Sequence, residues 1–382
     1  MFLYKILDNP LITQLGFLLL WIAIFIFYLN GLNKVKISNK IRFYLQTLFL
    51  FLSLVGFIRL YFNFLPYTPD SIYYLDGIFR SNLFGPNIYE YFIFFINSLF
   101  GDNVKILILI NILFYCLSIK ELVLLVPEHK NKNFSLFFIF AFFLPSVIWF
   151  IPNILRESLF IYFIVMVLKF SLDIEKNNNN FFLSLLLLFL FSFLSFSIRP
   201  QILPILFIWI AFIVSKKNKV FFIPFLILGI LVSQLSYIKY QILSKLSFHY
   251  LESFKTEGTD NLVGNIAFEN LIIPTTFYEL FVYIPELLFR FLFSPYIWNL
   301  SNLKYSFAYL DALFITVLVF IIIYKIFKKR IFNYDILYFS FLFLIILAVF
   351  EIAFTGAVRH RFPFILTLLP LIVYRDEKSD IT

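Results

Sequence analysis

The sequence predicts an all-α, polytopic transmembrane protein, on two features of its composition and one of its pattern. Hydrophobic residues fill 62% of the 382 positions and charged residues only 14%, against about 45–50% and about 25% in ordinary globular proteins. Phe alone occupies 58 positions. The apolar residues also gather in runs close to the roughly 20 residues that a membrane-spanning helix needs. Because no soluble fold hides so much apolar surface, we treat 1–382 as a single polytopic membrane domain.

About eleven apolar runs are predicted to span the membrane. Most have nearly the required length, whereas 202–215 and 362–374 are short and are expected to tilt, to be broken, or to begin inside the flanking loops. The predicted spans are 11–29, 43–63, 105–127, 134–151, 158–174, 181–198, 202–215, 220–237, 306–327, 336–354 and 362–374.

Lysine placement predicts the orientation of these spans. Eleven spans with an outside N-terminus put fourteen of the 21 lysines on the cytoplasmic side, as the positive-inside rule requires. The reversed topology would place the same set outside. We therefore expect a multi-pass membrane protein whose lysine-bearing turns face the cytoplasm. The lysine-bearing turns are 30–42, 128–133, 169–180, 216–219 and 325–330, with the tail 375–382.

Arginine follows the opposite pattern, because seven of the ten arginines fall on the predicted outer side or its membrane edge. Snorkelling at span ends is one explanation. The other is phosphate binding, since a guanidinium forms planar bidentate contacts and tolerates half-buried sites better than lysine does. We expect Arg59, near a span end without polar neighbours, and Arg80, on the first outer loop, to tolerate lysine. The residues predicted to bind a lipid-linked phosphate or pyrophosphate are Arg156, Arg199, Arg290, Arg359, His360 and Arg361.

Two long outer segments interrupt the alternation of short turns. The first, about 64–104, contains an apolar stretch at 92–100 that is too short to span and is predicted to be a helix lying in the interface. The second, about 238–305, has a polar middle followed by a semi-apolar stretch at 277–298, which suits an interfacial or re-entrant segment. Loops of this length usually carry function in a compact protein.

Three acidic residues stand at places where charge is costly or exposed to the outer surface. Glu157 follows Arg156 directly, so the two either neutralise each other or serve as a base and a ligand. Glu351 and Asp311 fall inside apolar segments, where an ionisable group is by default functional or paired. Asp311 is also close enough to a span end to be merely solvated. Pro363 is predicted to lie near the start of the final span.

Several classes of function are excluded or disfavoured. The chain has neither a G-x-x-x-x-G-K-[ST] nor a G-x-G-x-x-G sequence, which makes an ATP-driven pump improbable from this chain alone. A soluble nucleic-acid binder is excluded although the net charge is +9, and no nucleic-acid partner is expected. The three His residues are too few and too scattered to predict a metal cluster.

The first outer loop has an order of features found in a known superfamily. An outward span leads to an acidic loop with Asp70, Tyr73 and Tyr74, then to an interfacial helix ending in Leu-Phe-Gly-Asp, then to a span that starts Asn-Val-Lys. This resembles the first outer loop of the GT-C superfamily of polyprenyl-phosphate-sugar glycosyltransferases. The segments around Arg156-Glu157, 292–298 and 359–363 are similar to parts of bacterial membrane proteins from surface-polysaccharide clusters, which include O-antigen repeat-unit polymerases.

The resemblance implies a donor, an acceptor and a base. An acidic residue of the first outer loop acts as general base or metal ligand in GT-C enzymes; Asp70 matches best, Asp76 second, and Glu157 is a further candidate. The implied partners are an undecaprenyl-(pyro)phosphate-linked sugar, a glycan acceptor and the lipid bilayer. The chain departs from the superfamily by an extra N-terminal span and by lacking paired acidic residues, so a divalent metal stays an open alternative.

Two other functions stay open beside the transferase. A repeat-unit polymerase would use the same lipid-linked chemistry with another acceptor. A flippase or transporter of lipid-linked glycans would need charged residues lining a cavity at the bilayer midplane. The predicted concentration of charge at one face favours the enzyme.

Overall fold

The computed structural model describes most of the predicted helices. Asp70, Asp76, the predicted span 220–237 and the polar middle of the second outer loop lie outside the described residues. The described residues are 10–62, 88–100, 104–127, 132–176, 180–199, 202–217, 276–296, 303–328, 330–331, 333–351 and 354–375.

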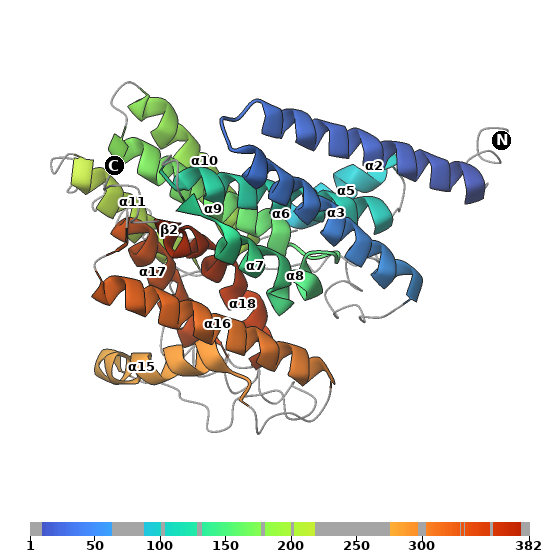
Figure 1. Cartoon of the computed structure of the whole chain (residues 1–382). Helices are drawn as coiled ribbons and strands as arrows, with labels where there is room; N and C mark the ends of the chain where they lie inside the picture. Colours follow the sequence, from blue (N-terminus) through green and yellow to red (C-terminus); the bar gives the residue numbers. More distant parts are fainter. Residues whose placement is uncertain are drawn as a thin grey trace. The chain divides into compact units, whose positions relative to one another are not determined.

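The described part of the chain is helical, with thirteen α-helices, one 3₁₀ turn and one two-residue antiparallel strand pair (Figure 1). Five helices are long and apolar enough to cross a membrane, which confirms the prediction of transmembrane helices and indicates a multi-pass membrane protein. They are α2 (Pro10–Asn33), α3 (Asn39–Phe62), α6 (Val104–Leu125), α10 (Phe181–Ile198) and α16 (Leu303–Phe327).

The other helices are shorter. The two stretches predicted as interfacial segments of the outer loops form α5 and α15. The shorter helices are α5 (Ile88–Phe100), α7 (Ser135–Phe143), α8 (Pro145–Phe150), α9 (Glu157–Lys176), α11 (Leu203–Lys217), α15 (Phe277–Phe293), α17 (Tyr334–Phe350) and α18 (Phe354–Thr367).

The predicted span 134–151 is not one continuous helix. It is divided into α7 and α8 at Leu144, whose backbone is extended at φ −58° and ψ 122°. The following residue is Pro145, and the proline ring disfavours helical backbone at the residue before it. The prediction of a span over 134–151 counted apolar residues and did not take this restriction into account.

The last predicted span, 362–374, also differs from the structure. Helix α18 begins at Phe354, continues through Pro363 and ends at Thr367, so Pro363 lies inside the helix and the prediction that it marks the start was wrong. The 3₁₀ turn η6 (Leu369–Ile372) follows. This segment runs along α16, since Arg361 bonds Asp311 near the start of α16 and the carbonyls of Leu371 and Val373 bond Lys325 near its end.

The chain divides into two compact units, and the boundaries fall inside α6, α7, α8 and α9. Unit 1 comprises 1–120, 141–143 and 147–162, and unit 2 comprises 121–140, 144–146 and 163–382. In unit 1, Gly56 of α3 packs against Ile108 and Ile112 of α6, and a Cβ at Gly56 would lie 3.2 Å from the Ile108 side chain. A small residue at this position thus allows close contact between these two helices.

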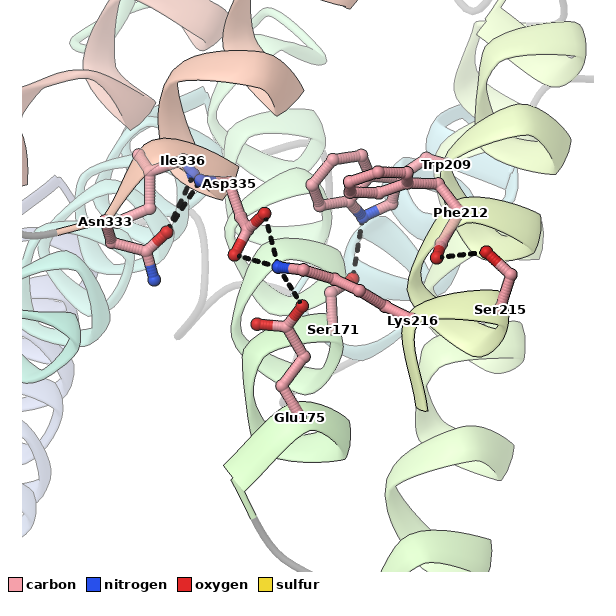
Figure 2. Close-up of polar contacts among 9 residues, drawn as sticks. All are labelled: Ser171, Glu175, Trp209, Phe212, Ser215, Lys216, Asn333, Asp335 and Ile336. Atoms are coloured by element: carbon pink, nitrogen blue, oxygen red, sulfur yellow. Dashed lines mark hydrogen bonds and ion pairs between the residues drawn. The ribbon is translucent and has the colours of Figure 1, made fainter. Parts of the chain in front are cut away.

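Polar contacts in unit 2 join the ends of helices at several predicted cytoplasmic turns. Lys216 Nζ lies 2.7 Å from Glu175 Oε1 and 2.7 Å from both carboxylate oxygens of Asp335, which links the ends of α9 and α11 to the start of α17 (Figure 2). Strand β1 (Lys132–Asn133) pairs with β2 (Tyr374–Arg375). These contacts join residues that lie in or next to the lysine-bearing turns predicted to face the cytoplasm.

Candidate functional site

Three residues of the predicted phosphate-binding set come together in unit 2. Arg199 is the residue at which α10 ends, directly before Pro200, and its side chain is 1% exposed. Arg359 and His360 lie in the second turn of α18 and are half-buried. The charges of Arg199 and Arg359 both act on His360. The charges of two arginines therefore reach one imidazole, although Arg199 and His360 are about 160 positions apart in the chain.

Glu351 completes this cluster, and sequence reasoning did not place it in the site. Its Oε2 lies 2.8 Å from His360 Nδ1, and its side chain is 4% exposed against 29% for His360. Glu351 ends α17 and stands three residues before α18, whose N-terminal amides and helix dipole favour a negative charge there. The available signal was a carboxylate in an otherwise apolar run nine residues before a histidine.

Gly356 leaves room for the Glu351 carboxylate. A Cβ built on Gly356 would collide with Glu351 Oε1 and lie 3.1 Å from its Cδ. Any larger residue would push the carboxylate away from its position beside His360. The fold thus reserves a space for this carboxylate in the first turn of α18.

The electrostatics of the cluster favour an anion. Burial lowers the pKa of His360, which lies outside the five helices that are long and apolar enough to cross a membrane, and the charge of Arg199 lowers it further. Glu351 opposes both effects, and Arg359 adds a smaller lowering. Two guanidinium groups beside a part-exposed imidazole can bind a phosphate ester by charge-assisted hydrogen bonds.

Arg361, also predicted to bind phosphate, lies in a fully buried network within the protein. Its Nη1 donates to the carbonyl oxygens of Phe291 and Ser294 at 2.6 and 3.0 Å, and its Nη2 donates to Asp311 Oδ2 at 3.2 Å. Asp311 Oδ1 in turn accepts from the Ser146 amide at 3.0 Å. Asp311 is 1% exposed, so the interpretation of it as a merely solvated residue was wrong. This network fixes α18, and with it Arg359 and His360.

Arg156 and Glu157 lie in unit 1, at the turn that leads into α9. Asn111 of α6 holds this turn, since its Nδ2 donates to the carbonyl oxygens of Asn153 and Leu155 at 2.6 and 3.1 Å. Glu157 is fully buried at the first position of α9, where a carboxylate is favoured by the helix dipole, and Arg156 is half-buried. Both candidates are thus held on a fixed turn.

Arg59, also in unit 1, has a polar partner that could not be predicted from the sequence. Its side chain is 2% exposed, and its Nη1 donates to the carbonyl oxygen of Trp149 at 2.8 Å. The expectation that Arg59 stands at a span end without polar neighbours was wrong. The reason is that the break after α8 frees carbonyl groups that need donors.

The remaining candidates are placed differently. Arg290 lies on α15 and pairs with Glu286 one turn earlier, a partner that is 48% exposed. Asp70 and Asp76 lie outside the described residues. Among the residues that the structure describes, no group of three or more His, Cys, Asp or Glu side chains could hold a metal ion.

No family model, curated protein or solved structure matches this chain.

Proposed function

We propose that this protein is an integral-membrane glycosyltransferase that uses undecaprenyl-linked sugar donors at the outer face of the bacterial cytoplasmic membrane. The observation that carries the proposal is that the positive charges of Arg199, at the end of α10, and of Arg359, on α18, both act on the part-exposed His360. Such an arrangement suits the phosphate of a lipid-linked sugar. About eleven spans, with the loops 64–104 and 238–305 outside, complete the proposed topology.

The arrangement of unit 2 supports this sidedness. On α16, Asp311 bonds Arg361 and Lys325 bonds the carbonyls of Leu371 and Val373; these two positions are 14 residues apart (325 − 311), or about 21 Å along a helix. The arginine-rich contacts and the lysine-rich contacts therefore lie toward opposite ends of this helix. If the lysine end is cytoplasmic, the anion site faces outward.

The chemistry needs one base and one site of positive charge. The acceptor hydroxyl oxygen attacks the anomeric carbon while its proton passes to a carboxylate base, for which we propose Asp70, with Asp76 and Glu157 as alternatives. The bond between the anomeric carbon and the phosphate oxygen breaks, and its electron pair leaves with the phosphate. Arg199 and Arg359 stabilise the charge that develops there.

A repeat-unit polymerase would catalyse the same glycosyl transfer to a longer acceptor, and the same anion site supports this alternative. A flippase would bind the phosphate without breaking this bond. Measuring glycan product distinguishes a flippase from the two enzymes, because only an enzyme forms a new glycosidic bond.

The test compares Arg→Lys variants. Arg199→Lys and Arg359→Lys keep the charge but lose the planar pair of donors, so each should reduce glycan product by about ten- to a hundredfold, the equivalent of roughly 1.5–3 kcal/mol. Arg156→Lys is tested alongside as the remaining outer candidate. Arg330→Lys, on an exposed residue of a cytoplasmic turn, is the matched control. Full product from all three outer variants, at normal abundance in the membrane, would show that these arginines are only anchors.

Asp70→Asn tests the base. The amide cannot take up the proton, so product should fall by about 10²–10⁴-fold while membrane abundance stays near wild type. Near-normal product would remove Asp70 from the mechanism and direct attention to Asp76 or Glu157.

A further inference from the structure

Three buried polar atoms beside the Arg361–Asp311 ion pair of unit 2 form no hydrogen bond with a residue that the structure describes. They are Arg361 Nε, Ser146 Oγ and Ser294 Oγ. Ser146 is bonded to the pair through its amide, which donates to Asp311 Oδ1 at 3.0 Å. Ser294 is bonded to it through its carbonyl oxygen, which accepts from Arg361 Nη1 at 3.0 Å. Each of the three atoms thus belongs to a residue of one hydrogen-bonded network.

The burial of this network makes a partner for these atoms necessary. Arg361 is 0% exposed, Asp311 and Ser146 are 1% exposed, and Ser294 is 2% exposed, so bulk solvent does not reach them. A buried ion pair is stable when its remaining donors and acceptors are hydrogen-bonded. Buried polar groups that protein atoms do not satisfy are usually bonded to ordered water.

The positions of Ser146 and Ser294 in the fold explain why their hydroxyl groups lack the usual local partner. Several fully buried serines of this chain donate to the carbonyl oxygen four residues earlier in the same helix; these are Ser118, Ser171, Ser195 and Ser340. Ser146 is the second residue of α8 and has no such carbonyl within its helix. Ser294 stands after the last turn of α15 with extended backbone, at φ −81° and ψ 155°. Both hydroxyls therefore need a partner from outside their own helix.

We propose that water is bound inside unit 2 beside the Arg361–Asp311 pair, held by Arg361 Nε and by the hydroxyl groups of Ser146 and Ser294. Burial on all sides restricts the ligand to a very small molecule. The ion pair has no net charge, so a bound ion would be left without a compensating charge. Water can accept from Nε–H, which only donates, and can bond a serine hydroxyl in either direction. This proposal does not depend on the proposed function.

The location of the pair gives the bound water a structural role. Asp311 lies in the stretch Ser306–Phe327 of α16, which is long and apolar enough to cross a membrane. At that depth lipid offers no hydrogen bonds, so polar groups must be satisfied within the protein or by enclosed water. The water completes the polar junction at which α15, α16 and α18 meet the start of α8.

Radiolytic footprinting tests the proposal on the full chain, purified in detergent. X-ray pulses convert water into hydroxyl radicals in place, so a buried side chain is oxidised quickly only when bound water lies beside it. Ser146→Cys and Ser294→Cys each put an easily oxidised thiol at the site. Cys116, which is fully buried in α6, is the reference within the same molecule. We expect both introduced thiols to be oxidised about tenfold faster than Cys116.

Ser340→Cys is the matched control. Ser340 is a fully buried serine of unit 2 whose hydroxyl already has partners, since it donates to the Ile336 carbonyl oxygen at 2.9 Å and lies 2.6 Å from Thr367 Oγ1. No water is needed to satisfy it. Its thiol should therefore be oxidised as slowly as Cys116.

The wild type supplies a comparison that needs no substitution. Phe291 and Phe343 are both 0% exposed, but only Phe291 belongs to the network, through its carbonyl oxygen, which accepts from Arg361. The ring of Phe343 packs against those of Phe339 and Phe364. We expect the oxidation of Phe291 to be faster than that of Phe343.

Each outcome decides the question. Fast oxidation at positions 146 and 294 with slow oxidation at position 340 supports bound water at the ion pair. Introduced thiols at 146 and 294 that react no faster than Cys116 would overturn the proposal. Equally fast oxidation in Ser340→Cys would overturn it as well, because radicals would then reach buried sites in general. Where the cysteine variants do not reach the membrane, equal oxidation of Phe291 and Phe343 in the wild type overturns it.

Discussion

The Nη2 atom of Arg361 lies 3.2 Å from Asp311 Oδ2, and both side chains are essentially withdrawn from solvent, at 0% and 1% exposure. A buried ion pair is stable only when both charges are paired and their remaining hydrogen-bonding groups are largely satisfied. Here Arg361 also donates to the Phe291 and Ser294 carbonyl oxygens, and Asp311 accepts from the Ser146 amide. The pair therefore joins α15, α16 and α18 to the start of α8.

Removing one member of this pair should be worse than removing both. Arg361→Met leaves the Asp311 carboxylate buried without its cation, at a cost of about 3–5 kcal/mol, whereas the double variant Arg361→Met/Asp311→Leu replaces both charges by apolar groups of similar size. We expect the single variant to lower the melting temperature of the purified protein more than the double variant does. Equal melting temperatures for the wild type and Arg361→Met would show that the pair does not hold α18.

The roles of Arg361 and Asp311 mark the limit of what the sequence could predict. Composition and the lengths of the apolar runs depend on averages over many residues, and they predicted transmembrane helices such as α2 and α16, which the structure supports. The partner of an individual arginine depends on which helices meet, and nothing in the local sequence distinguishes Arg361, which bonds protein carbonyls, from its neighbour Arg359. Glu351 was recognised as an unusual buried carboxylate, but its contact with His360 became visible only in three dimensions.

The breaks in the helices were more predictable than the long-range contacts. Pro145 divides α7 from α8 by a purely local effect, so the interruption of the predicted span 134–151 could have been read from the sequence. In contrast, α18 passes through Pro363 without ending there. The residues around both prolines are buried, and both segments are bonded to Asp311 of α16, so burial and this contact do not explain why only Pro145 separates two helices.

Arg59 should not tolerate lysine as a snorkelling residue would. Its Nη1 reaches the carbonyl oxygen of Trp149 at 2.8 Å from a side chain that is 2% exposed, and an ammonium cannot reproduce the direction and reach of that donor. We expect Arg59→Lys to cost about 1–3 kcal/mol of stability, which would appear as a lower melting temperature. Arg42→Lys, on the same helix with a half-buried side chain, is the control. Equal melting temperatures for the two variants would restore the snorkelling interpretation.

Reporter fusions test the proposed orientation. Fusions after Lys217 and Lys329 should report a cytoplasmic location, and a fusion near Thr259 should report an external one. A fusion after Arg375 should also be cytoplasmic, since β2 pairs with β1 at Lys132, in another of the lysine-bearing turns. A cytoplasmic signal at Thr259 would contradict the external placement of the second outer loop and, with it, the outward-facing anion site.

The ion cluster of Lys216, Glu175 and Asp335 is expected to contribute to the stability of the folded protein in a way that depends on pH. Burial lowers the pKa of Lys216, but the hydrogen bonds and charges of Asp335 and Glu175 raise it by more, so the pKa lies above its ordinary value. Burial raises the pKa of Glu175, and the charge of Asp335 adds to this against the opposing effect of Lys216. Lys216 therefore holds together two carboxylates that would otherwise repel each other.

We expect Lys216→Gln to lower the melting temperature by about 1–3 °C near pH 7.5, a modest effect because Lys216 is 44% exposed and partly exposed ion pairs contribute little. Glu175→Gln should cost less, since it removes a carboxylate whose ionised form is disfavoured in the folded protein. Lys217→Gln is the control, because it removes the same charge one residue away. Lys217 forms no ion pair with the residues that the structure describes, so this variant should leave the melting temperature unchanged.

Acidification separates the specific contribution of this cluster from a general loss of charge. A carboxyl group whose pKa is raised by folding destabilises the protein when it is ionised, so stability is recovered as pH falls through the raised pKa. In Lys216→Gln the pKa of Glu175 rises further, because its cation is gone. The deficit of this variant relative to wild type should therefore shrink as the buffer is taken from about pH 7.5 to about pH 5. A deficit that is constant or grows over this range would mean that Lys216 acts through its apolar stem and not through the two carboxylates.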